Sequence, residues 1–312
     1  MKVLITGIQG QDGSELAAIH HKNGDHVWGT ISSIDRNSKP SIANFITERL
    51  EDPHSCRKIL NQINPHKIYH LAAKHNSATS LSPISQELKR DMYDCHVGIT
   101  QNILEWQMSN PESKSLIALS SQMYTPIDRE TRISEGTKCA PRNFYAETKY
   151  QAMLLLQEYR EKYQIKTFGA ILFNHTSTRS KREFLFPHLA KQIAQVVTNV
   201  SNKISLQDSS SLIDICHADE VCDGMYKILN TEIPCEVIFS SGRLVSISDI
   251  ITRTLELLNF RGKVTLENKL GENLSQKFIY GDASRLRTMV GWRANLKPEE
   301  ILLEQVLREL SE

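Results

Sequence analysis

The chain has 312 residues, of which 40% are hydrophobic and 23% are charged, which suits a globular protein with a buried core in one large domain or two closely associated ones. Its formal net charge of +1 gives neither the basic field of a nucleic-acid-binding protein nor the acidic bias of a disordered chain. No segment approaches the roughly 20 apolar residues that a membrane helix needs, and the first residues do not resemble a signal peptide. The six cysteines lack a metal-binding spacing, so we expect a cytoplasmic protein with reduced thiols, no metal, no nucleic-acid partner and no membrane contact.

Short apolar segments alternate with helical ones along the first 173 residues. The expected strands lie, in chain order, at residues 2–6, 26–31, 67–73, 115–119 and 167–173. The expected helices lie at residues 14–23, 56–63, 98–108 and 144–163, with a last one at 298–310. This alternation predicts an α/β fold with a Rossmann-type doubly wound parallel sheet, which binds its ligand at the carboxyl ends of its strands.

The alternation weakens after Asn174, where short strands and loops are mixed. We therefore expect two interleaved parts. Residues 1–173 plus about 212–242 would form an NAD(P)-binding Rossmann domain, and residues from about 174–211 and 243–312 would form a smaller substrate-binding domain.

A glycine-rich segment directly follows the first expected strand and opens the first helix. It reads Gly7-Ile8-Gln9-Gly10-Gln11-Asp12-Gly13, a Gly-x-x-Gly-x-x-Gly pattern. Gly7 would permit a tight turn, Gly10 would let the backbone approach a pyrophosphate, and Gly13 would let the helix pack closely on the strand. The free N–H groups at the start of the helix would hold the anion. The pattern predicts a dinucleotide site that includes Gly7, Gln9, Gly10, Gln11, Asp12 and Gly13.

The residues after the second expected strand bear on the choice between NAD and NADP. NAD-binding proteins usually place an acidic residue there, where it holds the ribose hydroxyls. Here Ser32, Ser33 and Arg36 supply small hydroxyl groups and a cation instead. These groups favour the 2′-phosphate of NADP, while Asp35 leaves NAD open as the alternative.

Tyr145 and Lys149 lie four residues apart near the start of the longest expected helix, so they share one face of it. The Lys149 ammonium would lower the pKa of the Tyr145 phenol and bind the nicotinamide ribose, so that the phenol can move a proton as a hydride is transferred. Ser120 ends the preceding strand, and its hydroxyl could bond the same substrate oxygen. The three residues together predict a site for oxidation and reduction.

Several further motifs extend across the chain. They are Leu71-Ala72-Ala73, Leu172-Phe173-Asn174-His175, Ala190-Lys191-Gln192-Ile193, Asp214 with His217-Ala218, and Gly281-Asp282 with Gly291-Trp292. With the glycine loop, they make the chain resemble extended short-chain dehydrogenases/reductases of the NAD-dependent epimerase/dehydratase family. The resemblance is closest to the branch of GDP-mannose 4,6-dehydratases and GDP-4-keto-6-deoxymannose reductases, which implies a nucleotide-linked sugar as substrate.

The resemblance also implies roles for single residues. Those expected near the cofactor are Leu50, Leu71, Ala72, Ala73 and His175, besides Tyr145 and Lys149. Those expected near the substrate are Asn174, which would help to hold the diphosphate, Arg179 and His217. Helices at 98–108 and 144–163 would form a four-helix contact between two copies, which implies a homodimer.

Four departures separate the chain from this pattern. Gln122 stands where the dehydratases have a glutamate that exchanges a proton at C5 and assists the loss of water from C6, and an amide cannot do either. Ile213 and the segment Glu272-Asn273-Leu274-Ser275 replace elements that carry an arginine, and Arg49 replaces an aspartate at the adenine. These departures put the identity of the substrate in question and leave the hydride chemistry intact.

The combined observations favour hydride transfer at C4 of a nucleotide-linked hexose, by a 4-keto reductase or an epimerase. A GDP-mannose 4,6-dehydratase is the alternative within the class. A catalytically silent NADP-binding regulator is the alternative from another class, against which the intact Ser120, Tyr145 and Lys149 argue. His75 follows the cofactor strand, and we expect a loop histidine that could reach the active site.

Overall fold

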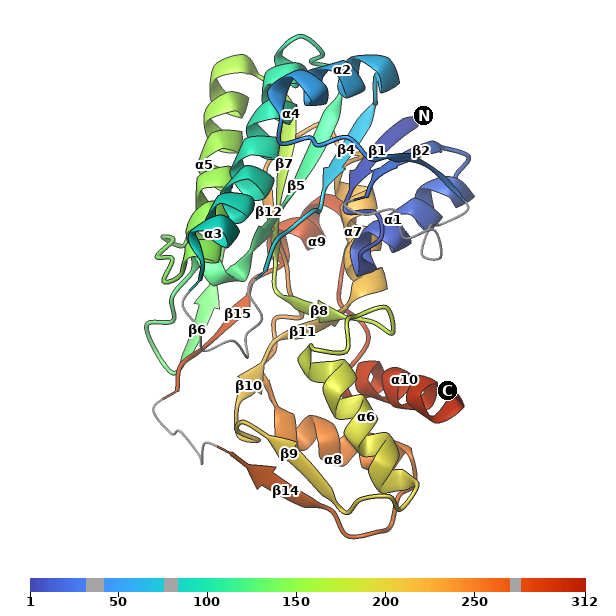
Figure 1. The fold of residues 1–312 in the computed structure, drawn as a ribbon. Coiled ribbons are helices and arrows are strands. Elements are labelled where there is room, and N and C mark those ends of the chain that lie inside the picture. Colours follow the sequence, from blue (N-terminus) through green and yellow to red (C-terminus); the bar gives the residue numbers. More distant parts are fainter. Residues whose placement is uncertain (32–41, 76–83, 270–275) are drawn as a thin grey trace.

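Seven parallel strands form the main sheet in the described part of the chain, as Figure 1 shows. The computed structural model describes residues 1–31, 42–75, 84–269 and 276–312. The strands lie in the order β12-β7-β5-β4-β1-β2-β3. Their bounds are β1 (Lys2–Thr6), β2 (His26–Thr30), β3 (Ala43–Ile46), β4 (Lys67–His70), β5 (Lys114–Ser120), β7 (Lys166–Leu172) and β12 (Glu236–Phe239). The strand order reverses between β1 and β4, the position at which doubly wound sheets bind their ligands, so the expected α/β fold is confirmed.

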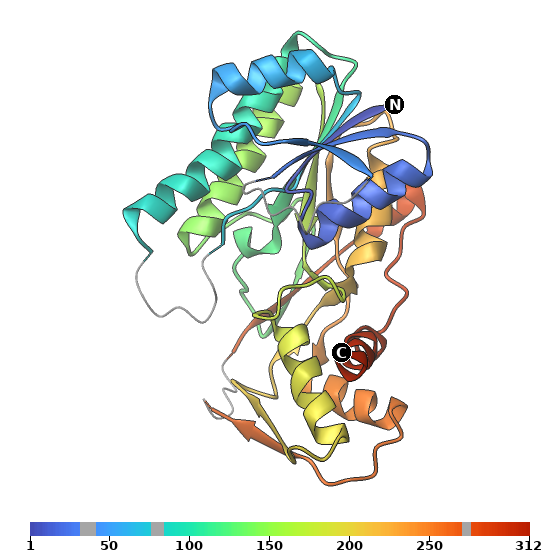
Figure 2. The same ribbon diagram turned by 45° about the vertical axis from the view of Figure 1, so that its right-hand side comes forward.

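Helices cover both faces of this sheet (Figures 1 and 2). The helices α1 (Gln11–Lys22), α7 (Ala218–Ile228) and α9 (Ser284–Val290) lie on one face, and α2 (Pro53–Ile63), α4 (Ile99–Met108) and α5 (Phe144–Tyr163) lie on the other. The side chains of β1 alternate between the two faces, as the two-residue period of a strand requires. Val3 packs in the core that contains α1 and α7, whereas Leu4 packs in the core that contains α2 and α4.

The helix expected at residues 98–108 is the last part of a longer helical segment. It begins with α3 (Gln86–Tyr93), continues through the π-turn η2 (Asp94–Gly98) and ends with α4. A π-turn adds a residue to one turn of the helix, and such turns are frequent at functional sites. None of the described helices is long and apolar enough to cross a bilayer.

A smaller lobe lies beyond the carboxyl ends of the sheet strands, as the turned view in Figure 2 shows. It contains α6 (Leu185–Val197), β9 (Lys203–Leu206), α8 (Ile247–Leu257), β14 (Thr265–Asn268) and α10 (Pro298–Ser311), together with the short pair β10 (Leu212–Ile213) and β13 (Val245–Ser246). These elements share a core of their own, to which Phe186, Ile250 and Leu302 belong. The lobe therefore has a separate apolar core beside the edge of the sheet where a ligand would bind.

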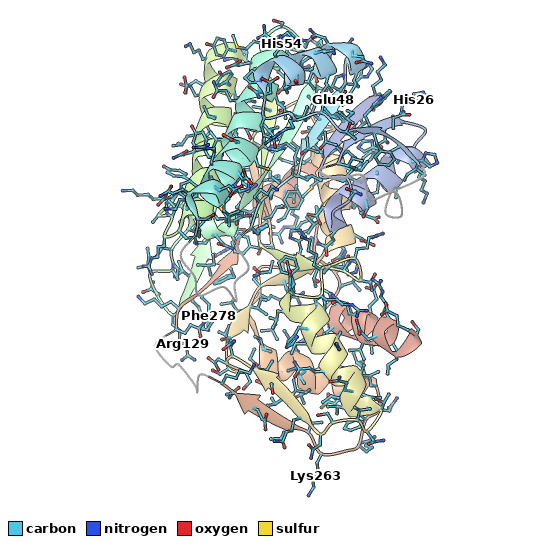
Figure 3. All side chains as sticks on the ribbon, in the orientation of Figure 1. His26, Glu48, His54, Arg129, Lys263 and Phe278 are labelled. Carbon is cyan, nitrogen blue, oxygen red and sulfur yellow. The ribbon has the colours of Figure 1, made fainter. Side chains whose placement is uncertain are left out.

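Two parallel strand pairs join the lobe to the sheet. One is β8 (Asn174–Thr176), which continues from β7, with β11 (Ile215–His217), and the other is β6 (Glu130–Ile133) with β15 (Phe278–Gly281). Figure 3 shows Arg129 and Phe278 side by side where the second pair begins, and there the Phe278 N–H donates to the Arg129 carbonyl at 2.8 Å.

The helix α9 belongs to the sheet rather than to the lobe. Leu286 and Trp292 are buried in the core that contains Val3, and the Trp292 Nε1–H donates to the Glu220 carbonyl of α7 at 2.6 Å. The expected division, which assigns all of residues 243–312 to the substrate-binding domain, therefore separates α9 from the helix against which it packs. We propose a division that keeps residues 1–173 and about 212–242 together and adds α9 to them.

Candidate active site

The glycine loop between β1 and α1 is shaped by close backbone contacts. Gly7 has a φ of +70°, and a Cβ on it would lie 3.0 Å from the Cα of Ala72. A Cβ on Gly13 would lie 2.4 Å from the Gly7 carbonyl oxygen. Gly10 donates its N–H to the same carbonyl at 2.9 Å and is the N-cap of α1. The loop is thus closed on itself, and the first N–H groups of α1 have no partner within the helix, as an anion site requires.

Thr6 fastens this loop to the neighbouring strand β4. Its Oγ1 accepts the N–H groups of Leu71 (3.1 Å) and Ala72 (3.0 Å) and lies 2.8 Å from Nδ1 of His70. His70 Nε2 lies 3.0 Å from the Cys95 carbonyl, so Nε2 carries the proton and Nδ1 accepts from the Thr6 hydroxyl. Burial, with the nearby Lys149 charge, lowers the pKa of His70 to about 3, which keeps this ring neutral. The expected cofactor strand therefore lies directly beside the glycine loop.

The three expected catalytic side chains come together at the carboxyl edge of the sheet. Ser120 ends β5, and Tyr145 and Lys149 lie one turn apart on α5, whose N-cap Asn143 accepts the Ala146 N–H at 2.8 Å. The Ser120 hydroxyl lies near enough to the Tyr145 phenol to favour its ionised form. The Lys149 Nζ lies 5.9 Å from the centre of the Tyr145 ring and donates to the Ala118 carbonyl at 2.7 Å.

Burial governs the ionisation of this group. Desolvation raises the pKa of Tyr145 to about 12, against the opposite effect of the Ser120 hydrogen bond. Desolvation lowers the pKa of Lys149 to about 8. The sequence predicted a lowered pKa for the phenol, but the pKa is raised because burial exceeds the stabilisation from its neighbours. The phenol is accordingly in its proton-donating form at neutral pH.

Gln122 lies beside Ser120, the serine expected to be catalytic. Its backbone N–H donates to Ser120 Oγ at 3.2 Å, and its Oε1 accepts from Asn143 Nδ2 at 3.4 Å. The side chain is exposed. The amide therefore lies next to the hydroxyl expected to bond the substrate oxygen, where it can form hydrogen bonds but cannot exchange a proton.

Two histidines contact the Tyr145 ring, and the sequence indicated only one of them as a candidate. The His75 ring stacks on it with centroids 4.5 Å apart and an angle of 28°. His96 meets it edge-on at 5.3 Å and 89°. His96 was missed because its contact depends on the π-turn η2, which no periodicity in the sequence indicates.

The first turn of α1 is also bound to the segment that leads into the lobe. His175 Nε2 lies 2.9 Å from Asp12 Oδ2, and its Nδ1 lies 2.9 Å from the Phe173 carbonyl. Both ring nitrogens thus face acceptors. Burial alone would lower the pKa of His175, but the Asp12 carboxylate raises it to about 9, so the ring is charged at neutral pH.

Gln11 and Glu15 extend this contact. Gln11 Oε1 accepts the Ser177 N–H at 2.9 Å. Arg179 forms ion pairs with Glu15 and, at 3.3 Å, with Asp219, and its side chain is 41% exposed. The glycine loop and the lobe are therefore linked through Gln11, Asp12 and Glu15, and Arg179 is part of this link.

The other expected residues occupy varied positions. Asn174 Nδ2 donates to the Asp214 carbonyl at 3.1 Å, and His217 accepts the Asp219 N–H at 3.2 Å and lies 2.8 Å from Glu304. Leu50 is buried, and its carbonyl accepts from Asn102 Nδ2 at 2.9 Å. Gln9 lies in the glycine loop. Ala73 directly follows Ala72, the residue that packs against Gly7 of that loop. Ser32, Ser33 and Arg36 lie outside the described residues, as does the segment Glu272-Asn273-Leu274-Ser275.

No cluster of three or more metal-binding side chains occurs among the described residues. His20, for example, is buried between Asp25 at 2.7 Å and the Tyr69 hydroxyl at 3.0 Å, far in the sequence from the catalytic group. Its nitrogens are both used inside the fold.

Two curated relatives match this chain almost from end to end. GDP-mannose 4,6 dehydratase 1 from Arabidopsis thaliana is 26% identical over 334 residues, which cover 98% of this chain and 89% of the relative. GDP-mannose 4,6 dehydratase 2 from Caenorhabditis elegans is 24% identical over 354 residues, which cover 99% of this chain and 88% of the relative.

Solved structures share the fold. A dTDP-glucose 4,6-dehydratase from Bacillus anthracis in complex with NAD superimposes with a TM-score of 0.80 at 17% identity, covering 98% of this chain and 96% of that one. RMD from Pseudomonas aeruginosa complexed with NADPH gives a TM-score of 0.77 at 18% identity, covering 100% and 99%. The family model of GDP-mannose 4,6 dehydratase matches residues 4–305. Because this match spans nearly the whole chain, the protein belongs to the GDP-mannose 4,6 dehydratase family, as the motifs predicted.

Proposed function

We propose that the protein transfers a hydride between NAD(P) and C4 of a nucleotide-linked hexose. Membership of the family identifies an NAD(P)-dependent enzyme that modifies nucleotide sugars. The observation that carries the proposal is the meeting of Ser120, Tyr145 and Lys149 at the carboxyl edge of the sheet. Beside it, the switch point between β1 and β4 holds a closed glycine loop at the start of a helix.

Each of the three side chains has a defined part. As the phenol, Tyr145 gives its proton to the C4 oxygen when the sugar is reduced, and as the phenolate it takes the proton of the C4 hydroxyl when the sugar is oxidised. Ser120, which lies beside the phenol, bonds the oxygen that reacts. The Lys149 ammonium, with its Nζ 5.9 Å from the centre of the Tyr145 ring, would stabilise the phenolate when that forms. When bound, NAD(P) accepts and returns the hydride, and the segment from Gly7 to Gly13 would hold its pyrophosphate while Lys149 would hold its nicotinamide ribose.

The comparisons support 4,6-dehydration better than the 4-keto reduction or epimerisation that the sequence favoured. The family model and both curated relatives named above are GDP-mannose 4,6 dehydratases. Gln122 is the observation that favours a reductase or an epimerase, because those reactions need no glutamate at this position. GDP-mannose is therefore the first substrate to test, and its 4-keto-6-deoxy product is the second.

NADP is the cofactor we propose over NAD. The support is the run of Ser32, Ser33 and Arg36, whose hydroxyl and guanidinium groups suit a 2′-phosphate. Titration of the protein with NADPH and NADH, followed by the fluorescence of the nicotinamide, tests this directly. Tighter binding of NADH would overturn it.

We also propose a homodimer through the outer face of α4 and α5. This face carries exposed apolar side chains at Met108 (42% exposed), Leu154 (45%) and Tyr163 (37%). Exposed apolar groups in one region are typical of an interface. Light scattering on the purified chain tests the proposal, and a monomer at micromolar concentration would contradict it.

Mass spectrometry of GDP-mannose and its 4-keto-6-deoxy product tests the function. Each is incubated in heavy water with the protein and with NADP⁺ or NADPH. Loss of water from GDP-mannose identifies a dehydratase, whereas a gain of two hydrogens on the keto sugar identifies a reductase. Tyr145→Phe is the control, because removal of the phenol should lower either rate by about 100-fold or more. Wild-type protein that binds NADP and changes neither sugar would instead favour a silent regulator or another substrate.

A further inference from the structure

A 4,6-dehydration needs a group that moves protons at C5 and C6 as well as at C4, and the Gln122 amide is not such a group. In the described part of the chain, three titratable side chains contact the Tyr145 ring, namely His75, His96 and Lys149. Lys149 is 3% exposed and donates to the Ala118 carbonyl. The candidates that remain are the two histidines.

His96 is fully engaged within the fold. Its Nε2 accepts the Lys74 N–H at 3.1 Å, so Nδ1 carries the proton and donates to Thr148 Oγ1 at 2.8 Å. Thr148 in turn donates to the Tyr145 carbonyl at 2.9 Å. The residue is 1% exposed, and burial, with the Lys149 charge, lowers its pKa, so the ring stays neutral. No nitrogen of His96 remains to exchange a proton with a sugar.

The π-turn η2 gives His96 this bridging position. Cys95, the residue before it, accepts the His70 Nε2–H with its carbonyl, so η2 is bonded to the end of the cofactor strand β4. His96 is bonded from the same turn to Lys74 and to Thr148, which itself donates to the carbonyl of Tyr145 in the first turn of α5. His75 directly follows Lys74, and Tyr145 lies in that first turn. The bridge therefore fixes the two stacked rings relative to each other.

His75 differs from His96 in each of these respects. Within the described residues, no hydrogen bond engages either of its nitrogens, and the residue is exposed. One face of its ring packs on Tyr145. Desolvation of that ring, followed by the charges of Lys149 and Lys181, lowers the pKa of His75 to about 4. At neutral pH it therefore has an unshared lone pair next to the residue that handles the C4 oxygen.

We propose that His75 is the proton-transfer group of the sugar site, in the role that Gln122 cannot fill, and that His96 is the positioning residue that holds it against Tyr145. This inference rests on the proposed hydride transfer at C4, because a ketone at C4 is what makes the C5 hydrogen acidic. The observation that carries it is the stacking of the His75 ring, whose nitrogens have no hydrogen-bond partner among the described residues, on the Tyr145 ring.

The single imidazole of His75 is enough for the proton transfers at C5 and C6. Bound NAD(P) would supply the hydride acceptor for C4, and the Tyr145 phenolate takes the proton of the C4 hydroxyl, which leaves a ketone. Neutral His75 takes the C5 proton, a C5–C6 double bond forms, the C6–O bond breaks, and the imidazolium gives the same proton to the departing hydroxyl to form water. The hydride then returns to C6, a solvent proton reaches C5 through His75, and Tyr145 releases its proton to solvent. The product made in heavy water thus carries one deuterium, at C5.

The test separates proton transfer from hydride transfer. The 4-keto-6-deoxy product of GDP-mannose is incubated in heavy water with the full chain and NADP⁺, and proton NMR follows the exchange of its C5 hydrogen, a step that needs no hydride. Reduction of NADP⁺ by GDP-mannose in a single turnover, followed at the absorbance of NADPH, reports hydride transfer. His75→Asn should slow the exchange by about 100-fold while hydride transfer changes little, and adding Gln122→Glu should restore the exchange.

A matched substitution far from the site supplies the control. His54 is an exposed histidine of α2, and Figure 3 shows it at the end of the molecule opposite to the lobe. His54→Asn should leave both rates unchanged. Exchange at the wild-type rate in the His75→Asn variant would overturn the inference. Absence of exchange in the wild type would overturn it as well, whereas reduction of NADP⁺ by GDP-mannose would show that the proposed hydride transfer still holds.

Two substitutions test the positioning part. An asparagine at position 96 keeps a donor for Thr148 and loses the acceptor for Lys74, whereas a glutamine reaches Lys74 and loses the donor for Thr148. His96→Asn should therefore lower C5 exchange more than hydride transfer, and His96→Gln should lower hydride transfer more than exchange. A purely structural residue would lower both rates by the same factor in both variants, and that result would overturn the positioning role.

Discussion

His175 and Asp12 form an ion pair between the strand β8 and the first turn of α1, with Nε2 and Oδ2 2.9 Å apart. The two side chains are 15% and 18% exposed, so water screens the pair only in part. The second nitrogen of His175 donates to the Phe173 carbonyl, so the neutral ring would leave one of two acceptors without a proton. The pair thus favours the charged imidazolium and joins the glycine loop to the start of the lobe.

The stability of the protein should depend on this pair at high pH. The pKa of His175 is raised to about 9 in the folded chain from an ordinary value of 6.5, so its contribution is complete below 6.5 and is lost as the pH rises through 9. Burial by itself would raise the pKa of Asp12, but the His175 charge and the hydrogen bonds from His175 and Gln11 together lower it. The contribution of Asp12 is therefore present above 3.8 and is lost as the pH falls through the folded value. The free energy of unfolding in urea should fall by up to about 3 kcal/mol between pH 6.5 and pH 10 in the wild type. His175→Gln should lack this dependence, and an equal pH dependence in both proteins would contradict the assignment.

Cofactor affinity should depend on the same pair. Asp12 lies in the first turn of α1, where the N–H groups would hold a pyrophosphate, and a bare carboxylate there would repel it. His175→Gln should weaken NADP⁺ binding by about 10-fold, and the double variant with Asp12→Asn should recover most of the loss. Calorimetric titration measures both, and 0.5 M salt should reduce the difference. A double variant no better than the single one would mean that His175 acts through packing and not through charge.

The elements predicted correctly from the sequence are those whose ends are set by residues adjacent in the chain. The helix expected at 144–163 matches α5 at both ends, because Asn143 caps its start and Gln164 ends it in the left-handed conformation. The first helix begins at Gln11 and not at Ser14, because its N-cap is Gly10, which has no capping side chain to signal the start. The strand expected at 67–73 ends at His70, because Thr6 takes the next two N–H groups away from the sheet.

The surroundings of the catalytic group could not be predicted in the same way. Tyr145 and Lys149 were found from a spacing of four residues, which a helix turns directly into proximity. His96 and Thr148 are separated by 52 residues, and Asp12 and His175 by 163. Such contacts depend on strand order and on the π-turn η2, and neither is encoded in a local pattern.

Gly13 should tolerate no side chain. A Cβ there would lie 2.4 Å from the Gly7 carbonyl oxygen and 2.7 Å from the Ile8 Cα, both of them backbone atoms of the loop. Gly13→Ala should therefore open the loop, lower the free energy of unfolding by about 1–3 kcal/mol and weaken NADP⁺ binding by at least about 10-fold. Gly136→Ala is the matched control, because nothing lies within 4 Å of its Cβ. Equal NADP⁺ affinities in the two variants would show that the close approach of helix and strand is not needed for binding.

Among the buried carboxylates at the junction between sheet and lobe, Asp214 should be the one whose substitution lowers the free energy of unfolding most. It is 1% exposed, and every partner of its two oxygens is a donor. Oδ1 accepts from the Ser241 N–H at 2.9 Å and the Ser241 hydroxyl at 2.7 Å, and Oδ2 accepts from the Gly281 N–H at 3.1 Å and from the Ser240 hydroxyl.

Asp214→Asn should therefore destabilise the protein nearly as much as Asp214→Ala, by about 2–4 kcal/mol, because the amide NH₂ would face a backbone N–H on either side. Urea unfolding followed by tryptophan fluorescence measures the loss. Asp223→Asn is the matched control, since Asp223 is 49% exposed and its ion pair with Lys227 is a surface pair worth at most about 1 kcal/mol. If Asp214→Asn and Asp223→Asn lower the free energy of unfolding by the same amount, the four donors around Asp214 do not select for a carboxylate.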